Sequence, residues 1–223
     1  MKCILLGGSG EVGGAVARQL IRNNGCTQLT MIGRRAVTTF QNEPKVTQIV
    51  LDTSASDFED TVKLNAQGHD VAISCLGIGS GTNSMTEAQM LAVEVTLLGQ
   101  FARACKAAGV KNFELLTAVG VSEQGVNSRV KYLRVLSKKL STVIDIGFEK
   151  LAVFKPGVIV GNAHTPNWMT PFTALIPDRL GWGNIRQDEL AQAFVAHLEK
   201  HLSRQSEPVV YYGNREMKQL VRS

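Results

Sequence analysis

The chain contains 223 residues, 44% of them hydrophobic and 19% charged, with a formal net charge of +5. This composition excludes disordered and fibrous proteins, and apolar runs such as 71–79 are too short to span a bilayer. The net positive charge is compatible with an anionic cofactor. No aromatic residues interleave with the densest basic pairs, Arg34-Arg35 and Lys138-Lys139, so we expect no nucleic-acid partner. No segment is typical of a signal peptide, and we expect a cytoplasmic protein without a membrane span.

The first part of the chain predicts a βαβ unit. Residues 2–7 form an apolar run that fits a strand buried on both faces. Residues 11–24 carry apolar side chains at helical spacing, and Gly25 is a natural helix stop. Residues 28–33 fit a second strand, so the unit closes within the usual length of a right-handed crossover.

The same alternation continues to the end of the chain. Further strands are expected at 46–51, 70–75, 112–117, 151–157 and 208–212, and further helices near 55–66, 86–108, 127–144 and 187–202, with a short final helix. Nearly uniformly apolar strands that alternate with helices indicate an α/β fold with a doubly wound parallel sheet, the Rossmann fold. We expect one domain over residues 1–223, with residues 161–184 as a substrate-side loop or small lobe.

A glycine-rich turn separates the first strand from the first helix. The turn has the sequence GGSGEVG and consists of Gly7, Gly8, Ser9, Gly10, Glu11, Val12 and Gly13. Early glycines permit a tight turn, Gly10 allows close approach of a pyrophosphate, and Gly13 allows close packing of helix on strand. The free amides and the positive end of the helix dipole then bind the diphosphate of a dinucleotide.

The end of the second predicted strand bears on the choice of cofactor. NAD-binding proteins place an Asp or Glu there for the ribose hydroxyls, whereas this chain has Arg34 and Arg35. Two guanidinium groups suit the 2′-phosphate of NADP(H), with Arg34 as the stronger candidate. The alternative is that one or both arginines are solvated loop charges.

Other cofactor contacts follow from the position of residues at carboxyl ends of parallel strands. This rule nominates Asp52 and Thr53 beside the adenine, Leu76 and Gly77 beneath the adenosine, and Thr117 with Pro156, Gly157 and Val158 near the nicotinamide. Each of these residues also has a simpler interpretation as an ordinary strand terminus.

The ordered set of motifs resembles the short-chain dehydrogenase/reductase superfamily in its atypical or extended branch. The segments that carry the resemblance are GGSGEVGG, LTMIGRR, GHDVAISCLG, VKNFELLTAVG, KYL and VFKPGVIV. They are most similar to the Tat-interacting, tumour-suppressor-like oxidoreductase family, in the same order up to about residue 161. Beyond that point the resemblance fades as far as the helix near Gln187.

The resemblance implies a catalytic hydroxyl at Thr117 and a catalytic tyrosine at Tyr132. Members of the superfamily also place a lysine four residues after the tyrosine, where it lowers the pKa of the phenol and holds the ribose. This chain has Leu136 there. Lys139 lies on the same helix face about two turns beyond Tyr132, and a side chain reaching back is one way to replace the missing cation.

Histidine and cysteine patterns give no metal site. His197 and His201 are four residues apart on a predicted helix, but no third ligand is near them in the sequence, and we expect surface histidines. The four cysteines show no Cys-x-x-Cys spacing and are expected to be free buried thiols.

Two functions fit these observations. The first is an NADPH-dependent oxidoreductase that reduces an unidentified carbonyl-type small molecule, with Thr117 and Tyr132 facing the substrate. The second is a catalytically impaired NADP(H)-binding redox sensor that acts through protein partners. Leu136 supports the sensor, and the retained Tyr132 and Thr117 support the enzyme.

Overall fold

A central parallel sheet organises the computed structural model, which describes residues 1–79, 82, 84–161, 183–202 and 207–222. The strands are β1 (Lys2–Leu6), β2 (Gln28–Gly33), β3 (Val46–Val50), β4 (Val71–Ser74), β5 (Asn112–Leu116), β6 (Lys150–Phe154) and β9 (Val209–Tyr212). Their order is β3-β2-β1-β4-β5-β6-β9, and every neighbouring pair is parallel. The predicted Rossmann sheet is therefore confirmed.

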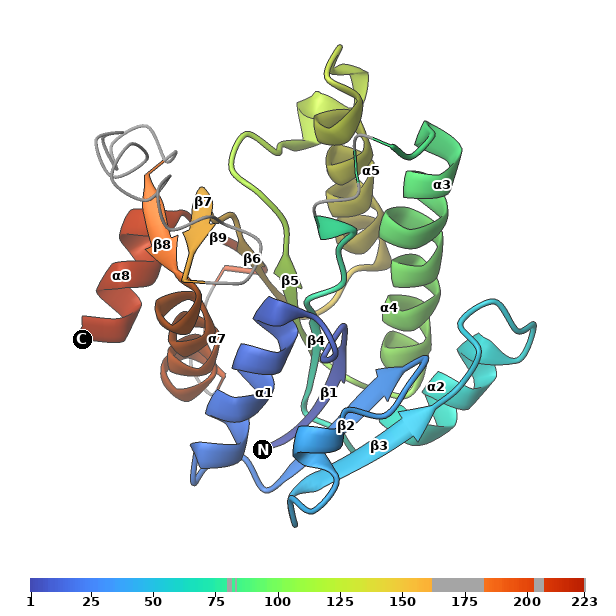
Figure 1. Ribbon diagram of the computed structural model, residues 1–223, viewed down its shortest axis with the longest axis vertical. Coiled ribbons are helices and arrows are strands. Elements are labelled where there is room, and N and C mark those ends of the chain that lie inside the picture. Colours follow the sequence, from blue (N-terminus) through green and yellow to red (C-terminus); the bar gives the residue numbers. More distant parts are fainter. Residues whose placement is uncertain (80–81, 83, 162–182, 203–206, 223) are drawn as a thin grey trace.

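Helices cover both faces of this sheet (Figure 1). One face packs against α1 (Glu11–Arg22), α7 (Gln187–His201) and α8 (Asn214–Arg222). The other face packs against α2 (Phe58–Ala66), α4 (Leu98–Ala107) and α5 (Lys131–Ile146). α4 continues a helix that begins as α3 (Glu87–Leu91) and passes through a π-helical segment, η3 (Ala92–Leu97). Short 3₁₀ turns occur at η1 (Thr38–Phe40) and η4 (Glu123–Asn127).

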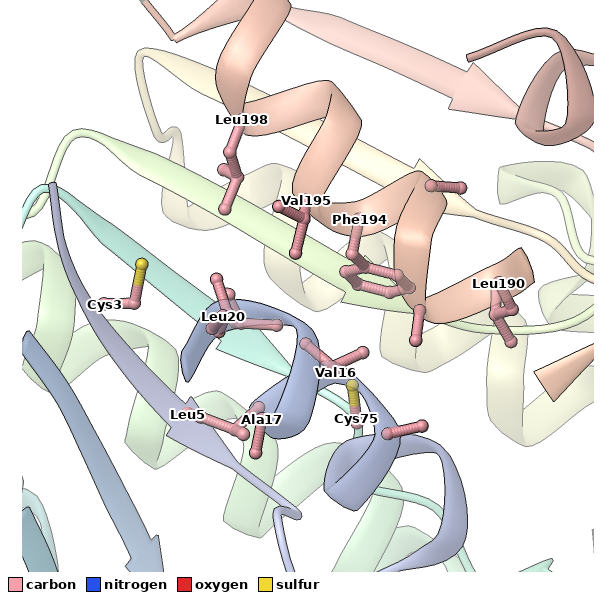
Figure 2. Packing of buried hydrophobic residues seen from close by; sticks show 14 of the residues in the cluster. Cys3, Leu5, Val16, Ala17, Leu20, Cys75, Leu190, Phe194, Val195 and Leu198 are labelled. Carbon is pink, nitrogen blue, oxygen red and sulfur yellow. The ribbon is translucent and has the colours of Figure 1, made fainter. Parts of the chain in front are cut away.

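Strand β1 explains why the apolar runs are continuous. Cys3 and Leu5 belong to the core beneath α1 and α7, whereas Ile4 and Leu6 belong to the core beneath α2 and α4. Because successive side chains point to opposite faces, a strand covered on both faces needs apolar residues at every position. Figure 2 shows the first core, where Leu20 of α1 lies close to Val195 and Leu198 of α7 above the strands.

The predicted strands and helices of the central sheet are found in the predicted order. A small parallel sheet of β7 (Val158–Val160) and β8 (Asn184–Arg186) was not expected, because strands of three residues are too short to show a sequence pattern.

The prediction of a surface histidine at 197 is wrong: His197 is buried and its Nδ1 lies 2.6 Å from Oε1 of Glu114 on β5. α7 packs against both the sheet and α1, so residues on its sheet-facing side, such as His197, are shielded from solvent. The side chain of His201 lies outside the described residues.

Several expectations concern absences or undescribed residues. All four cysteines are free and buried, as predicted. In the described part of the chain, no helix has the length and apolar character needed to cross a bilayer, and no three metal-binding side chains cluster. The loop at 162–182, which we expect on the substrate side, lies outside the described residues.

Candidate functional site

The turn between β1 and α1 accepts only glycine at two positions. Gly7 has a φ of +91°, and a Cβ there would lie 2.7 Å from the backbone at Cys75 and Leu76. A Cβ on Gly13 would lie 2.1 Å from the carbonyl oxygen of Gly7. These distances are far below van der Waals contact, so the turn is a backbone cradle that side chains would fill.

The first turn of α1 presents unused hydrogen-bond donors. No side chain caps the helix, whose N-cap is Gly10. The early amides of an α-helix have no partner within the helix, and the dipole makes this end positive. The uncapped helix of 12 residues and the glycine cradle together fit the diphosphate of a dinucleotide.

A cleft of about 600 Å³ opens beside this cradle at the carboxyl ends of the strands. Its walls come from the start of α1, the turns after β4 and β6, the end of β5, and parts of η3, α5 and β7. They consist of Gly10, Glu11, Val12, Cys75, Leu76, Gly77, Ile78, Gly79, Glu94, Leu116, Thr117, Ala118, Tyr132, Leu136, Lys139, Pro156, Gly157 and Ile159. Seven of the predicted cofactor residues and both predicted catalytic residues are in this set. Gly7, Gly8, Ser9 and Gly13 form the turn behind it.

Two hydroxyl groups in the cleft have no hydrogen-bond partner among the described residues. Thr117 follows β5 and its Oγ1 is buried without a partner. Tyr132 stands at the start of α5, and burial followed by the negative charge of Glu94 raises the pKa of its phenol to about 12. Native proteins rarely leave buried polar atoms unsatisfied, so Oγ1 of Thr117 marks a candidate binding site, and the partly buried Tyr132 lines the same cleft.

The position of the missing lysine is apolar in the structure as well. Leu136 is 2% exposed and lines the cleft one turn after Tyr132. Lys139 also reaches the cleft, but its Nζ is bonded to the carbonyl of Leu76 at 2.7 Å and to Oε2 of Glu94 at 2.9 Å. The lysine that the sequence suggested as a replacement is therefore engaged by a carboxylate.

Glu94 is the site residue that sequence analysis missed. It occupies the same helical stripe as Met90 and Leu98, both fully buried, and is itself 0% exposed. An acidic residue on an otherwise apolar stripe is an unusual pattern that could have drawn attention to it.

The predicted adenosine end lies at the ends of β2 and β3, outside the lining of the cleft. Arg34 and Arg35 are exposed just after β2. Asp52 is exposed after β3, with Thr53 partly buried beside it. Hydrogen bonds from Ser54, with a smaller effect of the Arg34 charge, lower the pKa of the Asp52 carboxyl. The arginines are accessible to an anion, and Asp52 already accepts local hydrogen bonds.

The turn after β6 is anchored from the C-terminal helix. Asn214 accepts a hydrogen bond from the Gly157 amide at 3.0 Å and donates one to the carbonyl of Gly183 at 2.5 Å. Pro156 and Gly157 line the cleft, whereas Val158 begins β7 and is not among the lining residues; Ile159 takes that place. Asn214 thereby fixes the wall next to Thr117.

Fold and cleft define a Rossmann-type dinucleotide-binding protein, and comparisons with known proteins agree. A family model described as NAD(P)H-binding matches residues 7–141. The protein HTATIP2 of Rattus norvegicus is 34% identical over 183 residues, covering 78% of this chain and 71% of that protein. The chain belongs to this NAD(P)H-binding family and is similar to HTATIP2.

Solved structures with low sequence identity show the same fold. UDP-glucuronic acid 4-epimerase from Bacillus cereus in complex with NAD has a TM-score of 0.69 at 15% identity, covering 96% of this chain and 78% of that chain. WbmH of Bordetella bronchiseptica in complex with NAD⁺ has a TM-score of 0.68 at 13% identity, covering 95% and 75%.

The expected cytoplasmic location is contradicted by fungal relatives. The mitochondrial protein fmp52 of Aspergillus niger is 29% identical over 160 residues, covering 71% of this chain and 66% of that protein. The mitochondrial protein FMP52-1 of Scheffersomyces stipitis is 23% identical over 240 residues, covering 99% and 98%. The expectation was wrong because it rested on the lack of a secretory signal peptide, and that signal carries no information about mitochondrial import.

Proposed function

We propose that this protein is an NADPH-dependent oxidoreductase that reduces the carbonyl group of a small molecule. The observation that carries the proposal is that the buried, unpartnered hydroxyl of Thr117 and the phenol of Tyr132 line the same cleft, beside an uncapped helix and a glycine cradle. The glycine cradle and the helix would bind the diphosphate of a dinucleotide, and the two hydroxyls would form hydrogen bonds with a polar group of the substrate. The names of the fungal relatives make mitochondria the compartment in which we propose that it acts.

Different parts of the site hold different parts of the cofactor in this proposal. The amides at the start of α1 bind the diphosphate, Arg34 and Arg35 bind the 2′-phosphate, and Asp52 with Thr53 lies beside the adenine. Leu76 and Gly77 support the adenosine, and the segment 156–158 lies near the nicotinamide. Bound NADPH supplies the hydride that reduces the carbonyl carbon.

The residues of the chain handle the proton and exclude water. Tyr132 donates its phenolic proton to the carbonyl oxygen, and Thr117 donates a hydrogen bond to the same atom. Because the pKa of Tyr132 is raised to about 12, the phenol stays protonated at neutral pH. Apolar walls from Leu116, Leu136 and Ile159 keep solvent from the reacting carbonyl.

Arg34→Ala tests the choice of NADPH. Loss of a charged hydrogen-bond partner of the 2′-phosphate should weaken NADPH binding about 10- to 150-fold while NADH binding changes little. Calorimetric titration of both cofactors measures the difference. Arg103→Ala is the control, since Arg103 is an exposed arginine of α4 bonded to Glu59. Equal effects of Arg34→Ala on the two cofactors would refute the assignment.

Tyr132→Phe tests the reaction. The variant keeps the ring and removes the proton donor, so turnover on a panel of aldehydes and ketones should fall about 100-fold or more. NADPH affinity should stay within about twofold of the original protein, because the phenol contacts the substrate. Full turnover in this variant would exclude Tyr132 as the acid.

A redox sensor is the second candidate, supported by the departures around Tyr132. Leu136 replaces the lysine of the family pattern, and Lys139 is bonded to Glu94 and the Leu76 carbonyl. A sensor should bind NADPH more tightly than NADP⁺ and show no turnover, even after Leu136→Lys. It would then signal to protein partners through the bound form.

A further inference from the structure

A buried ion pair forms part of the cleft wall. Lys139 of α5 and Glu94 of η3 both line the cleft, with Nζ and Oε2 2.9 Å apart and side chains 2% and 0% exposed. Every other pair of a Lys or Arg with a carboxylate in the described ranges has side chains at least 26% exposed. Burial therefore distinguishes this pair.

Both members of the pair also bind the backbone that follows β4. Lys139 donates to the carbonyl of Leu76 at 2.7 Å, and Oε1 of Glu94 accepts from the amide of Ile78 at 3.0 Å. The π-helical segment interrupts the α-helical register at Glu94, as π-segments often do at functional sites. The pair is thus fixed in position, with its charges held against the cleft.

Stability alone is a weak reason to keep such a pair. Desolvation of two charges offsets much of their attraction, and apolar residues of similar volume often serve the fold equally well. Leu136 and Leu140 of α5 and Leu97 of η3 already belong to the same apolar core. A role in the cleft explains better why two charges are retained there.

The pair shares the cleft with the residues expected near the nicotinamide ring. With the diphosphate at the start of α1, the other half of a dinucleotide extends across the ends of β4, β5 and β6. Thr117, Tyr132 and Pro156, which we expect near the ring, line the same cleft as Lys139 and Glu94. The negative charge of Glu94 acts at this end, since it contributes to the raised pKa of Tyr132.

We propose that Lys139 and Glu94 neutralise each other beside the nicotinamide ring, so that neither charge biases the cleft toward the oxidised or the reduced form of the cofactor. The proposal rests on the proposed binding of NADP(H). The oxidised nicotinamide ring carries a positive charge and the reduced ring is neutral, whereas the phosphates are the same in both forms. A net-neutral pair beside the ring favours neither form strongly, and loss of either partner exposes one charge to the ring.

The experiment measures the dissociation constants of NADP⁺ and NADPH by calorimetry and compares their ratio, NADP⁺ over NADPH, among variants. Lys139→Met leaves the carboxylate of Glu94 and should lower the ratio about tenfold, because the positive ring gains a favourable charge. Glu94→Gln leaves the ammonium of Lys139 and should raise the ratio about tenfold. The double variant Lys139→Met/Glu94→Gln should return to the original ratio.

Lys138→Met is the matched control, because it removes the same charge one position earlier from a side chain that is 40% exposed and paired with Glu87. Its ratio should match that of the original protein. If a buried single variant does not fold, Leu136→Lys adds a positive charge to the same wall without breaking the pair, and should raise the ratio.

The outcomes separate two failures. If the original protein binds neither form, the proposed function fails. If it binds both forms and the variants weaken both equally, or leave the ratio unchanged, the pair has only a structural role and the inference is overturned.

Discussion

The two halves of the cleft relate to their family pattern in different ways. The phosphate-binding half, built from β1 and α1, retains the whole pattern, including glycines where a Cβ would meet backbone at 2.7 Å and 2.1 Å. The half built from β5 and α5 retains Thr117 and Tyr132 but replaces the lysine with Leu136 and adds a buried ion pair.

The two halves differ because the first binds its ligand through the backbone and the second acts through side chains. Diphosphate binding depends on backbone amides and on the absence of side chains, so nearly any substitution in the turn fills the space that the ligand or the helix needs. Proton transfer depends on individual side chains, which can be lost or moved while the sheet and helices stay in place. Cofactor binding is therefore the more robust property of this fold.

Gly13→Ala should break the phosphate-binding half completely. A Cβ at 2.1 Å from the Gly7 carbonyl forces the turn and helix apart, so NADPH affinity should fall by about 100-fold or more. Calorimetric titration measures the loss. Gly14→Ala is the control: its Cβ lies 3.5 Å from the nearest backbone atom, an ordinary contact, and its affinity should be unchanged. Equal affinities in the two variants would show that the turn does not bind the cofactor.

The fold could be predicted because its signals are local and repeated. Apolar runs such as 2–6 are continuous since the strands are covered on both faces, and the glycine turn identifies the strand–helix junction. Regular alternation then implies a parallel sheet. β7 and β8 were missed because they have three residues each and pair only through a long connection.

The site could be predicted only in part, because its chemistry depends on contacts between distant segments. The family motifs nominated Tyr132 and Thr117, which both line the cleft, whereas the Lys139–Glu94 contact joins residues 45 positions apart in the sequence. His197 was misassigned for the same reason: its partner Glu114 lies on a strand 83 residues away. Residue spacing along a helix shows which residues share a face of that helix, but it does not show which other segment packs against that face.

Leu136→Lys should restore part of the family pattern in the second half. An ammonium group one helical turn from Tyr132 favours the phenolate, so the pKa of Tyr132 should fall from about 12 by about one to three units. Ultraviolet titration, with the Tyr132→Phe background subtracted, isolates this group from Tyr211 and Tyr212. Leu136→Met conserves volume without charge and should leave the pKa near its original value. An unshifted pKa in Leu136→Lys would mean that the Lys139–Glu94 pair already controls the electrostatics at Tyr132.

Thr117→Val should give the smallest change among these variants. It tests whether the hydroxyl of Thr117 serves to bind a ligand or to stabilise the fold. The buried Oγ1 of Thr117 has no partner among the described residues, so an isosteric methyl should raise the free energy of unfolding by about 1 kcal/mol while turnover falls. Thr30→Val is the matched control, because Thr30 is also buried but its Oγ1 lies 2.9 Å from Nε2 of His69. Loss of that bond should lower the free energy of unfolding by about 1 kcal/mol. Urea denaturation measures both changes in the free energy of unfolding. If Thr117→Val is more stable than the original protein but less active, the hydroxyl of Thr117 serves to bind the substrate. Destabilisation equal to that of Thr30→Val would instead assign Thr117 to the fold.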